Sequence, residues 1–411
     1  MSDAVVTVDS IAAGGDGVAR AGGMVVFVPR TAPGDVAEVA LETRGRFARG
    51  RLRALRSASP LRVDPPCEHY VRDRCGGCQL QHLGYEAQRA AKARIIGDAL
   101  RRIGRREVED PEVRAAPRPW RYRRKLTLAL RRRGAAWIAG LHPYDAPGRV
   151  FALRDCPITD ERVLAVWREV MAAADDLPRA AELRGAVRLD EHGDASFVLE
   201  GGTRWPRSEA FVARVPSLTS LWWVSEGAGG ERTLLHARGE RAATGASFTQ
   251  VNEAVAAALG AHVVARALAR APETVVDAYA GVGDTAAALA AAGARVTAIE
   301  LDPDAAAWAA RRLPAGSRAV AARVEDALPD ALPADVVILN PPRAGVHERV
   351  TAALDAARGT RAVLYVSCNP ATLARDVARL PGWRIASLVA FDMFPQTAHV
   401  ESVCELVPES A

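Results

Sequence analysis

The chain has 411 residues, enough for two or three domains with separate cores, and 49% of its residues are apolar. No apolar run is long enough to cross a bilayer, and no basic segment followed by an apolar stretch marks a signal peptide. We therefore expect a monomeric cytoplasmic protein and not a membrane protein.

The net charge of +5 is unevenly distributed along the chain. Residues 89–133 hold sixteen Lys or Arg against five Asp or Glu, a local excess of +11. Such a basic segment favours a polyanion as partner, although arginines that solvate one face of the protein would give the same composition.

Residues 1–59 predict a small β-barrel. Three β-rich runs, at 5–8, 24–29 and 36–41, are separated by glycine-containing turns. Residues 44–53 then interleave arginine with small and apolar residues. That pattern suits contact with an RNA backbone, and an exposed edge strand would show it as well.

Residues 60–241 predict a mixed α+β central domain whose strand order the sequence does not define. An arginine-rich helix is expected at 85–103, and a strand at 120–128. In that strand arginines alternate with aromatic and apolar residues, so we expect Arg123, Arg124 and Lys125 to bind RNA.

Residues 242–411 alternate strands and helices at the spacing of a doubly wound sheet. The fold class is therefore α/β, with a Rossmann-like domain at the end of the chain. The expected strands are 275–279, 295–301, 319–324, 335–339, 362–366, 384–392 and 402–407, and helices are expected at 284–292 and 305–313.

Polar residues at successive strand ends of this domain predict a cofactor site. Tyr279 and Gly281 lie in a loop that opens a helix, where the backbone can approach a ligand closely. Glu300 can bind two ribose hydroxyls, and Asp326 can accept from an adenine amino group. Three such contacts favour S-adenosylmethionine, with NAD as the alternative. Asn340 follows the fourth strand, where its amide can bind a base edge or merely form a turn.

Cys368 follows the apolar strand at 362–366 and directly precedes a helix that begins with Pro370. A helix N-terminus lowers the pKa of a nearby thiol, and strand ends are where α/β sheets place reactive groups. We interpret Cys368 as a nucleophile and keep a buried structural cysteine as the alternative.

Together these motifs resemble the uracil-5 RNA methyltransferases that form 5-methyluridine in tRNA or 23S rRNA. The resemblance spans nearly the whole chain and is carried by residues 247–252, 281–283, 340–343, 367–370 and 394–401. It implies a TRAM domain at 1–59, a class I methyltransferase domain and S-adenosylmethionine as cofactor. In one departure, the family usually has Asp where this chain has Asn340.

The resemblance also implies roles for single residues. Cys368 would add to uracil C6, and Glu401 would act as the general base that removes the C5 proton. Gln250 would contact the pyrimidine and, with Asn340, would lie beside the cofactor. A cytosine-C5 methyltransferase is the enzymatic alternative, and an RNA-binding protein without turnover is the non-enzymatic one.

Cys67, Cys75 and Cys78 are spaced C-x7-C-x2-C, with Cys156 far downstream. Four thiolates suit either zinc or an iron–sulfur cluster, and spacing alone does not separate the two. Residues 75–82 match the members of the family that carry a [4Fe–4S] cluster, although the first gap is usually shorter there. The resemblance therefore implies a cluster held by these four cysteines.

Overall fold

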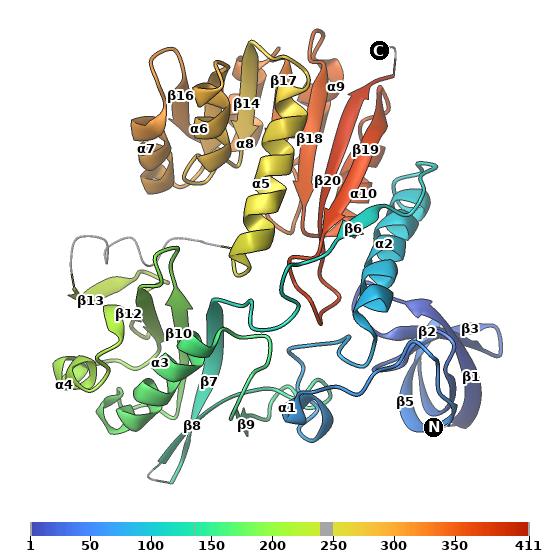
Figure 1. The fold of residues 1–411 in the computed structure, drawn as a ribbon, viewed down its shortest axis with the longest axis vertical. Coiled ribbons are helices and arrows are strands. Elements are labelled where there is room, and N and C mark those ends of the chain that lie inside the picture. The colour runs from blue at the N-terminus through green and yellow to red at the C-terminus, as the bar shows by residue number, and fades with distance from the viewer. Residues whose placement is uncertain (1, 135, 239–249, 410–411) are drawn as a thin grey trace.

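The computed structural model describes residues 2–134, 136–238 and 250–409 (Figure 1). The described residues form a closed β-barrel, a seven-stranded sheet and an eight-stranded sheet, in chain order. None of the helices in these ranges is both long and apolar enough to cross a membrane.

The N-terminal barrel confirms the prediction of a small β-domain. Its strand order is β1-β2-β3-β5-β4. The strands are β1 (Ser2–Ile11), β2 (Gly17–Ala21), β3 (Met24–Val28), β4 (Val36–Arg44) and β5 (Phe47–Ser57). Alternate residues such as Val6, Val26 and Val39 fill the barrel core, as a period of two requires. The arginine-rich run at 44–53 lies largely in β5, which pairs with both β3 and β4 and is therefore not an edge strand.

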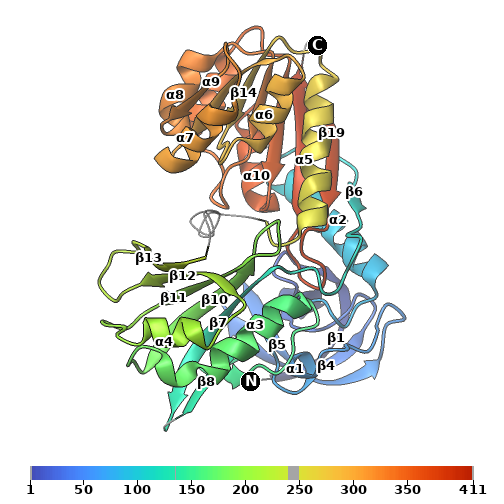
Figure 2. The ribbon, with the colours of Figure 1, turned by 60° about the vertical axis from the view of Figure 1, so that its left-hand side comes forward.

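The middle of the chain forms the seven-stranded sheet, in the order β13-β12-β11-β10-β7-β8-β9. The strands are β7 (Lys125–Arg133), β8 (Ala136–Leu141), β9 (Phe151–Ala152), β10 (Glu182–Leu189), β11 (Ala195–Glu200), β12 (Leu218–Val224) and β13 (Thr233–Ala237). Helices α3 (Glu161–Ala172) and α4 (Ser208–Ala213) cover one face, and Figure 2 shows the other face turned toward the C-terminal sheet. The strand predicted at 120–128 begins only at Lys125, so Arg123 and Arg124 precede it.

The C-terminal sheet confirms the Rossmann-like prediction. Its order is β16-β15-β14-β17-β18-β20-β19-β6. The strands are β14 (Thr274–Ala278), β15 (Arg295–Glu300), β16 (Arg318–Ala321), β17 (Val336–Leu339), β18 (Ala362–Ser367), β19 (Trp383–Phe391) and β20 (Glu401–Pro408), joined at the edge by β6 (Glu112–Arg114). Strands β14 to β18 are parallel, and β20 is antiparallel to both of its neighbours. Because helices cover both faces, β17 and β18 are buried along their whole length.

Two layers of helices flank this sheet. On one side lie α2 (Tyr85–Arg102), α8 (Val324–Ala331), α9 (Glu348–Ala356) and α10 (Pro370–Ala378); on the other lie α5 (Glu253–Leu268) and α6 (Asp284–Ala291). Helix α7 (Pro303–Arg312) packs on β15 and β16. The third predicted strand, 319–324, ends early at Ala321, and Val324 already starts α8.

Residues 85–114, which the sequence placed in the central domain, pack on the C-terminal unit. Helix α2 contacts α10, and β6 pairs in parallel with β19. The domain division at 59/60 and 241/242 stays a prediction, and its second boundary falls among residues outside the described ranges.

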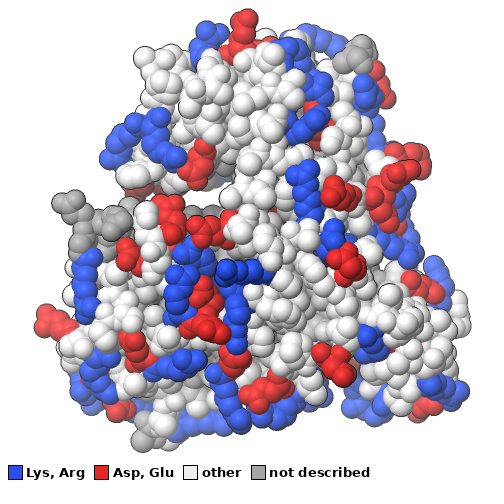
Figure 3. All heavy atoms as spheres, in the orientation of Figure 1, with Lys and Arg blue, Asp and Glu red and all other residues white. Residues whose placement is uncertain are grey.

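Much of the basic excess at 89–133 is paired inside the protein. Carboxylates within 3.0 Å neutralise several of its side chains: Arg89 with Glu86, Lys92 with Asp392, Arg101 with Asp98 and Asp110, Arg121 with Asp155, and Arg131 with Glu182. On the face drawn in Figure 3, basic and acidic side chains are interspersed. The local excess therefore contributes to packing as well as to any surface for a polyanion.

The packing of α2 on the C-terminal sheet predicts a stability effect. Leu100 is fully buried in the same core as α10, so Leu100→Ala should lower the free energy of unfolding by about 2–5 kcal/mol. Urea denaturation measures this change. Arg102→Ala on the exposed side of the same helix is the control and should change stability by less than about 0.5 kcal/mol. Equal effects of the two variants would contradict the packing described.

Candidate active site

Cys368 and Glu401 lie side by side because of the register of two strands. Ser367 at the end of β18 pairs with Ser402 in the antiparallel β20, so the next position, Cys368, faces Glu401. Both lie at the carboxyl edge of the parallel strands, where the sequence predicted reactive groups. A cavity of about 170 Å³ opens beside Cys368. Its lining comes from three parts of the fold: Ala13 from the barrel, Ile95 from α2, and Arg343, Cys368, Asn369, Pro370, Ala398, His399 and Val400 from the C-terminal domain.

The Cys368 thiol is half-buried, and its pKa is raised above the ordinary value. Burial is the main cause, and the negative charge of Glu401 adds to it. The charge of Arg343 and a hydrogen bond from its side chain act in the opposite direction. The predicted lowering of this pKa by the helix N-terminus is therefore wrong in its net direction, because burial beside a carboxylate outweighs it.

Glu401 is only 7% exposed, and burial raises its pKa to about 7, while Arg343 opposes the shift. A carboxyl group with this pKa exchanges its proton near neutral pH, as a general base must. Glu401 thus has the environment that its predicted role needs.

Arg343, which the sequence reasoning named only as part of a motif, acts electrostatically on both Cys368 and Glu401. Its loop follows β17, and several contacts fix that loop. The Arg343 carbonyl accepts from Asn369 Nδ2 at 3.3 Å, and the Ala344 carbonyl accepts from Arg375 at 2.8 Å. The carboxylate of buried Asp376 accepts from the backbone N–H of Val346 at 3.0 Å and from the Tyr365 hydroxyl at 2.7 Å. In the sequence, the signal for this residue was its position directly after two prolines.

The predicted cofactor residues Tyr279, Gly281 and Glu300 meet at the carboxyl ends of β14 and β15. The Glu300 carboxylate accepts from Gly281 N at 2.8 Å and from Asp302 N at 2.9 Å, which holds the glycine loop against β15. Gly283, at the start of α6, has φ +81°, and a Cβ there would lie 2.7 Å from Ala309 Cβ. Glycine is therefore required for the close approach of α6 to α7.

The acidic pair after β16 lies in the first turn of α8 rather than at a strand end. Asp326 has a side chain that is 54% exposed and forms an ion pair with Arg349 at 2.8 Å. Glu325 is more buried, and its charge adds to the burial that raises the pKa of Tyr279 to about 12. Glu325 is therefore the one of the two whose charge affects the pKa of Tyr279. The adenine-binding role expected for Asp326 stays a prediction.

Asn340 and Gln250 differ in how well the structure defines their surroundings. Asn340 is exposed after β17, and its backbone N–H donates to Ala278 O at 3.2 Å, beside Tyr279. Gln250 is partly buried at the start of a described range, whereas residues 247–249 of the same motif lie outside it. The roles of both side chains stay predictions.

Cys67, Cys75, Cys78 and Cys156 are all buried free thiols in one part of the central domain. Burial is the largest cause of the raised pKa of Cys75, Cys78 and Cys156, and the charges of neighbouring cysteines raise it further, to about 11 for Cys75. These electrostatic effects connect every pair among the four. Within the described ranges, no group of three or more His, Cys, Asp or Glu side chains is arranged to hold a metal ion.

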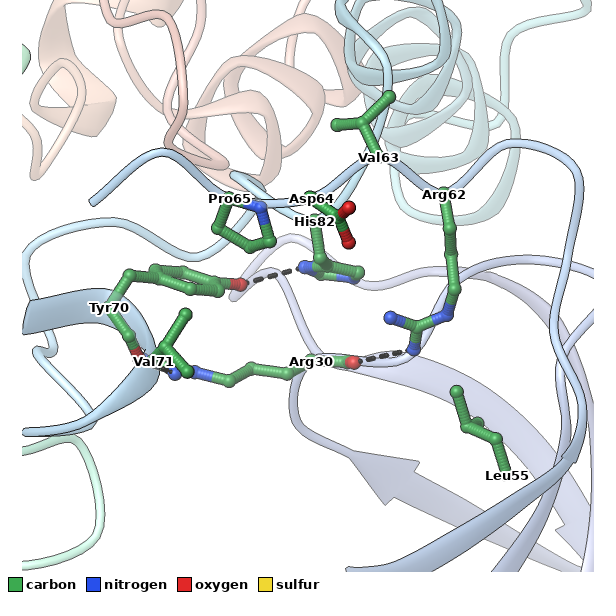
Figure 4. Close-up of a pocket in the computed structure, with 9 residues that line it drawn as sticks. All are labelled: Arg30, Leu55, Arg62, Val63, Asp64, Pro65, Tyr70, Val71 and His82. Atoms are coloured by element: carbon green, nitrogen blue, oxygen red, sulfur yellow. Dashed lines mark hydrogen bonds between the residues drawn. The ribbon is translucent and has the colours of Figure 1, made fainter. Parts of the chain in front are cut away.

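A larger cavity of about 590 Å³ lies where the barrel meets the cysteine-bearing segment (Figure 4). Arg30 donates to the carbonyls of Tyr70 and Cys75, and Arg62 donates to Arg30 O at 2.9 Å. The Tyr70 hydroxyl bonds to His82 Nδ1 at 2.7 Å. The bonds of Arg30 and Arg62 join the barrel to the segment that follows it, and their residues do not line the cavity beside Cys368.

The three predicted RNA-binding residues have different surroundings. Arg124 bonds to the Glu253 carboxylate and to Asp190 O, and its side chain is only 12% exposed, so it joins the central domain to α5. Lys125 is exposed. Partial burial is the main cause of its lowered pKa, followed by the charges of Arg188, Arg184, Arg232 and Arg123. The basic surface is thus centred on Lys125 rather than on Arg124.

Comparison with known proteins places this site in a family. Residues 315–407 match the family model described as tRNA (uracil-5-)-methyltransferase. An uncharacterized RNA methyltransferase of Halalkalibacterium halodurans is 31% identical over 98% of this chain and 96% of its own length. Another, of Gloeobacter violaceus, is 34% identical over 98% of this chain and 95% of its own. The chain belongs to a family of RNA methyltransferases.

The fold agrees with that of a solved structure over almost its whole length. Pyrococcus abyssi tRNA (uracil-54, C5)-methyltransferase, in complex with S-adenosyl-L-homocysteine, superimposes with a TM-score of 0.74. The match covers 98% of this chain and 99% of that one at 23% identity, so it shows the shared fold.

The opposing charges around Cys368 predict how its thiol responds to substitution. Glu401→Gln removes a negative neighbour and should lower the pKa of Cys368, whereas Arg343→Met removes a cation and should raise it. Because the thiolate is the reactive form, alkylation by iodoacetamide at neutral pH should be several-fold faster in the first variant and slower in the second. Mass spectrometry, with Cys368→Ala as control, identifies the labelled residue. Shifts in the same direction for both variants would contradict the geometry.

Proposed function

We propose that this protein is an S-adenosylmethionine-dependent RNA methyltransferase that forms 5-methyluridine in tRNA or 23S rRNA through a covalent intermediate between Cys368 and uracil C6. The observation that carries the proposal is the Cys368–Glu401 pair across β18 and β20, together with Arg343, which lines the same cavity as Cys368. The family assignment supports it, as does the uracil-54 specificity of the similar archaeal enzyme.

The residues at the ends of β14 and β15 fit the proposed cofactor. Tyr279, Gly281 and Glu300 would bind its adenosine part, with Asp326 or its neighbour Glu325 at the base, and Gln250 and Asn340 at the side of the RNA. Glu300 already orders the glycine loop, and its carboxylate oxygens can accept further hydrogen bonds. The cofactor would supply an electrophilic methyl group on a sulfonium centre.

The chemistry begins with a poor nucleophile, uracil C5. Addition of the Cys368 thiolate to C6 makes C5 electron-rich, so that C5 can form a bond to the methyl group. Arg343 favours the thiolate, because it hydrogen-bonds the sulfur and carries a positive charge. The uracil must leave any stacked helix to reach a cavity of this kind.

The reaction ends when Glu401 takes the C5 proton and the bond between C6 and sulfur breaks, which releases the product and restores the thiolate. Glu401 must be ionised to act. With a pKa raised to about 7 by burial, it is ionised above that pH, so turnover should rise as the pH increases through about 7. Arg343, between the two groups, opposes the rise of both pKa values.

Asn340 permits uracil and does not by itself exclude cytosine. A side-chain amide can accept from uracil N3–H and donate to O4, and the flipped amide meets the reversed pattern of cytosine. A cytosine-C5 methyltransferase is therefore the second candidate. The matched family and the intact Cys368–Glu401 pair favour the uracil enzyme, and they also disfavour an RNA-binding protein that lacks turnover.

We further propose that Cys67, Cys75, Cys78 and Cys156 hold a [4Fe–4S] cluster. Four buried thiols that interact in every pairing have the donor chemistry of such a group. Each thiolate of a cluster binds a different iron, so cluster ligands lie farther apart than the ligands of one zinc ion. The cluster would act as a structural link, outside the methyl-transfer steps.

Substitution of the two catalytic residues tests the proposed reaction. Cys368→Ala should abolish both turnover and covalent attachment to RNA that contains 5-fluorouridine. Glu401→Gln should allow methyl transfer and then accumulate enzyme bound to natural RNA, with turnover lower by about 10²–10⁴-fold. Denaturing gels detect the adduct, and mass spectrometry of digested RNA identifies the methylated nucleoside. If 5-methylcytidine is the product, the second candidate is correct.

Metal analysis tests the proposed cluster. Protein purified without oxygen should be brown and contain about four iron and four sulfide per chain. Cys78→Ser should lose the colour and lower the stability of the central domain, since Cys78 belongs to its core. Cys404→Ser, in the C-terminal core, is the matched buried control and should keep the iron. Colourless protein with stoichiometric zinc would contradict the assignment.

The different surroundings of Lys125 and Arg124 predict separable effects on RNA binding. Lys125→Ala should weaken binding and lower the slope of log affinity against log salt by about one, as expected for one lost phosphate contact. Arg124→Ala should mainly lower stability, because it removes bonds to Glu253 and Asp190. Filter binding at several salt concentrations and urea denaturation measure the two effects. An unchanged slope for Lys125→Ala would mean that this lysine only solvates its face.

A further inference from the structure

The connection between β19 and β20, residues 392–400, is held from outside its own sheet. Figure 1 shows it descending from the C-terminal sheet toward α2 and the central domain. It is buried except for Phe394, which is half-buried, and His399, which lines the cavity beside Cys368. At its end, Glu401 is the first residue of β20. The loop therefore carries both His399 and the proposed base.

Gln396 lies at the centre of this loop and is only 2% exposed. Its φ of +71° is rare for a residue other than glycine and persists only where neighbours enforce it. Its backbone N–H donates to Gln88 Oε1 at 2.9 Å, and its side-chain oxygen accepts from Gln88 Nε2 at 2.9 Å. Its carbonyl accepts from Gln79 N at 3.1 Å and from Leu80 N at 3.0 Å. These bonds satisfy both backbone polar groups of Gln396 with partners far away in sequence.

Other bonds fix the rest of the loop from the same direction. Lys92 on α2 pairs with Asp392 at 2.5 Å and donates to Phe394 O at 3.0 Å. The Tyr122 hydroxyl donates to Pro395 O at 3.0 Å. All these partners belong to residues 79–122, whereas Cys368 is placed by β18 and α10. Glu401 is thus held on one side by the pairing of β20 with β18 and β19, and on the other by residues 79–122 through the loop that leads into it.

We propose that Gln396 is a positioning residue, through which α2 and the segment following Cys78 set the place of Glu401 relative to Cys368. This inference rests on the proposed function, because it assumes that Glu401 removes the C5 proton. The paired bonds with Gln88 and the two backbone donors at 79 and 80 give partners to both backbone polar groups and to the side-chain oxygen of Gln396. Loss of the Gln88 bonds loosens the loop that leads into Glu401, while the pairing of β18 with β20 still holds the two strands together.

The proposal predicts that one step of the reaction is affected. A displaced base slows removal of the C5 proton but leaves addition of Cys368 to C6 and methyl transfer intact. The covalent enzyme–RNA adduct should therefore accumulate. A contribution to stability alone would instead reduce the amount of active protein without any build-up of adduct.

Two variants test this. Gln88→Met has nearly the same volume and removes both bonds to Gln396. Gln396→Gly tolerates the positive φ and keeps the backbone bonds but removes the side chain. In each, kcat on natural RNA should fall by about 10- to 100-fold and the KM for RNA and cofactor should stay within about twofold, as expected for a misplaced base. Leu100→Ala, which opens a cavity on the same helix away from the loop, is the control.

The readout is the adduct on denaturing gels with natural RNA and cofactor present. Accumulation in Gln88→Met and Gln396→Gly, without accumulation in Leu100→Ala, supports the proposal. Wild-type kcat in both variants, or a loss of activity without adduct as in Leu100→Ala, overturns it. The proposed function is tested separately by wild-type protein and 5-fluorouridine RNA. If no adduct forms there, the assigned reaction itself fails, whatever the variants do.

Discussion

The antiparallel pairing of β20 with β18 is the constraint on which the rest of the site depends. A parallel sheet places its functional residues at the carboxyl ends of its strands, and an antiparallel strand inserted among them begins at that same edge. The Ser367–Ser402 pair therefore brings a residue from the end of one strand, Cys368, next to the first residue of another, Glu401. A slip of one residue would turn Glu401 to the opposite face of the sheet.

This pairing places the Glu401 carboxyl group beside the Cys368 thiol, whose ionisation it disfavours. Burial and the Glu401 charge both disfavour the Cys368 thiolate, and burial also disfavours ionised Glu401. Arg343 acts on both groups in the opposite direction, and the Asp376 network holds its loop in place. Arg343 therefore offsets part of the effect that burial has on the pKa of both groups. Removing the Glu401 carboxyl group or the Arg343 guanidinium group should therefore also change the pKa of Cys368.

The sequence predicted what depends on local pattern. The barrel, the parallel strands and the place of Cys368 after β18 follow from alternating or continuous apolar runs, and the glycine loop follows from its composition. What the sequence did not show depends on contacts between distant segments. The pairing of β6 with β19 carries no local signal in three residues, and the ion pair of Arg124 with Glu253 joins positions that are far apart in the chain. Glu325 and Asp326 are neighbours in the first turn of α8, and they differ in that the Glu325 side chain is the more buried of the two.

The same long-range contacts explain why the chain resists division into independent parts. Helix α2 packs on α10 and also supplies Gln88 and Lys92 as partners of the loop at 392–400, and the barrel contributes Ala13 to the cavity beside Cys368. Each such contact buries polar groups whose partners lie in another part of the chain, and an unpaired buried group is costly. A change in the central domain therefore reaches the active site through the loop at 392–400, without any contact with the RNA.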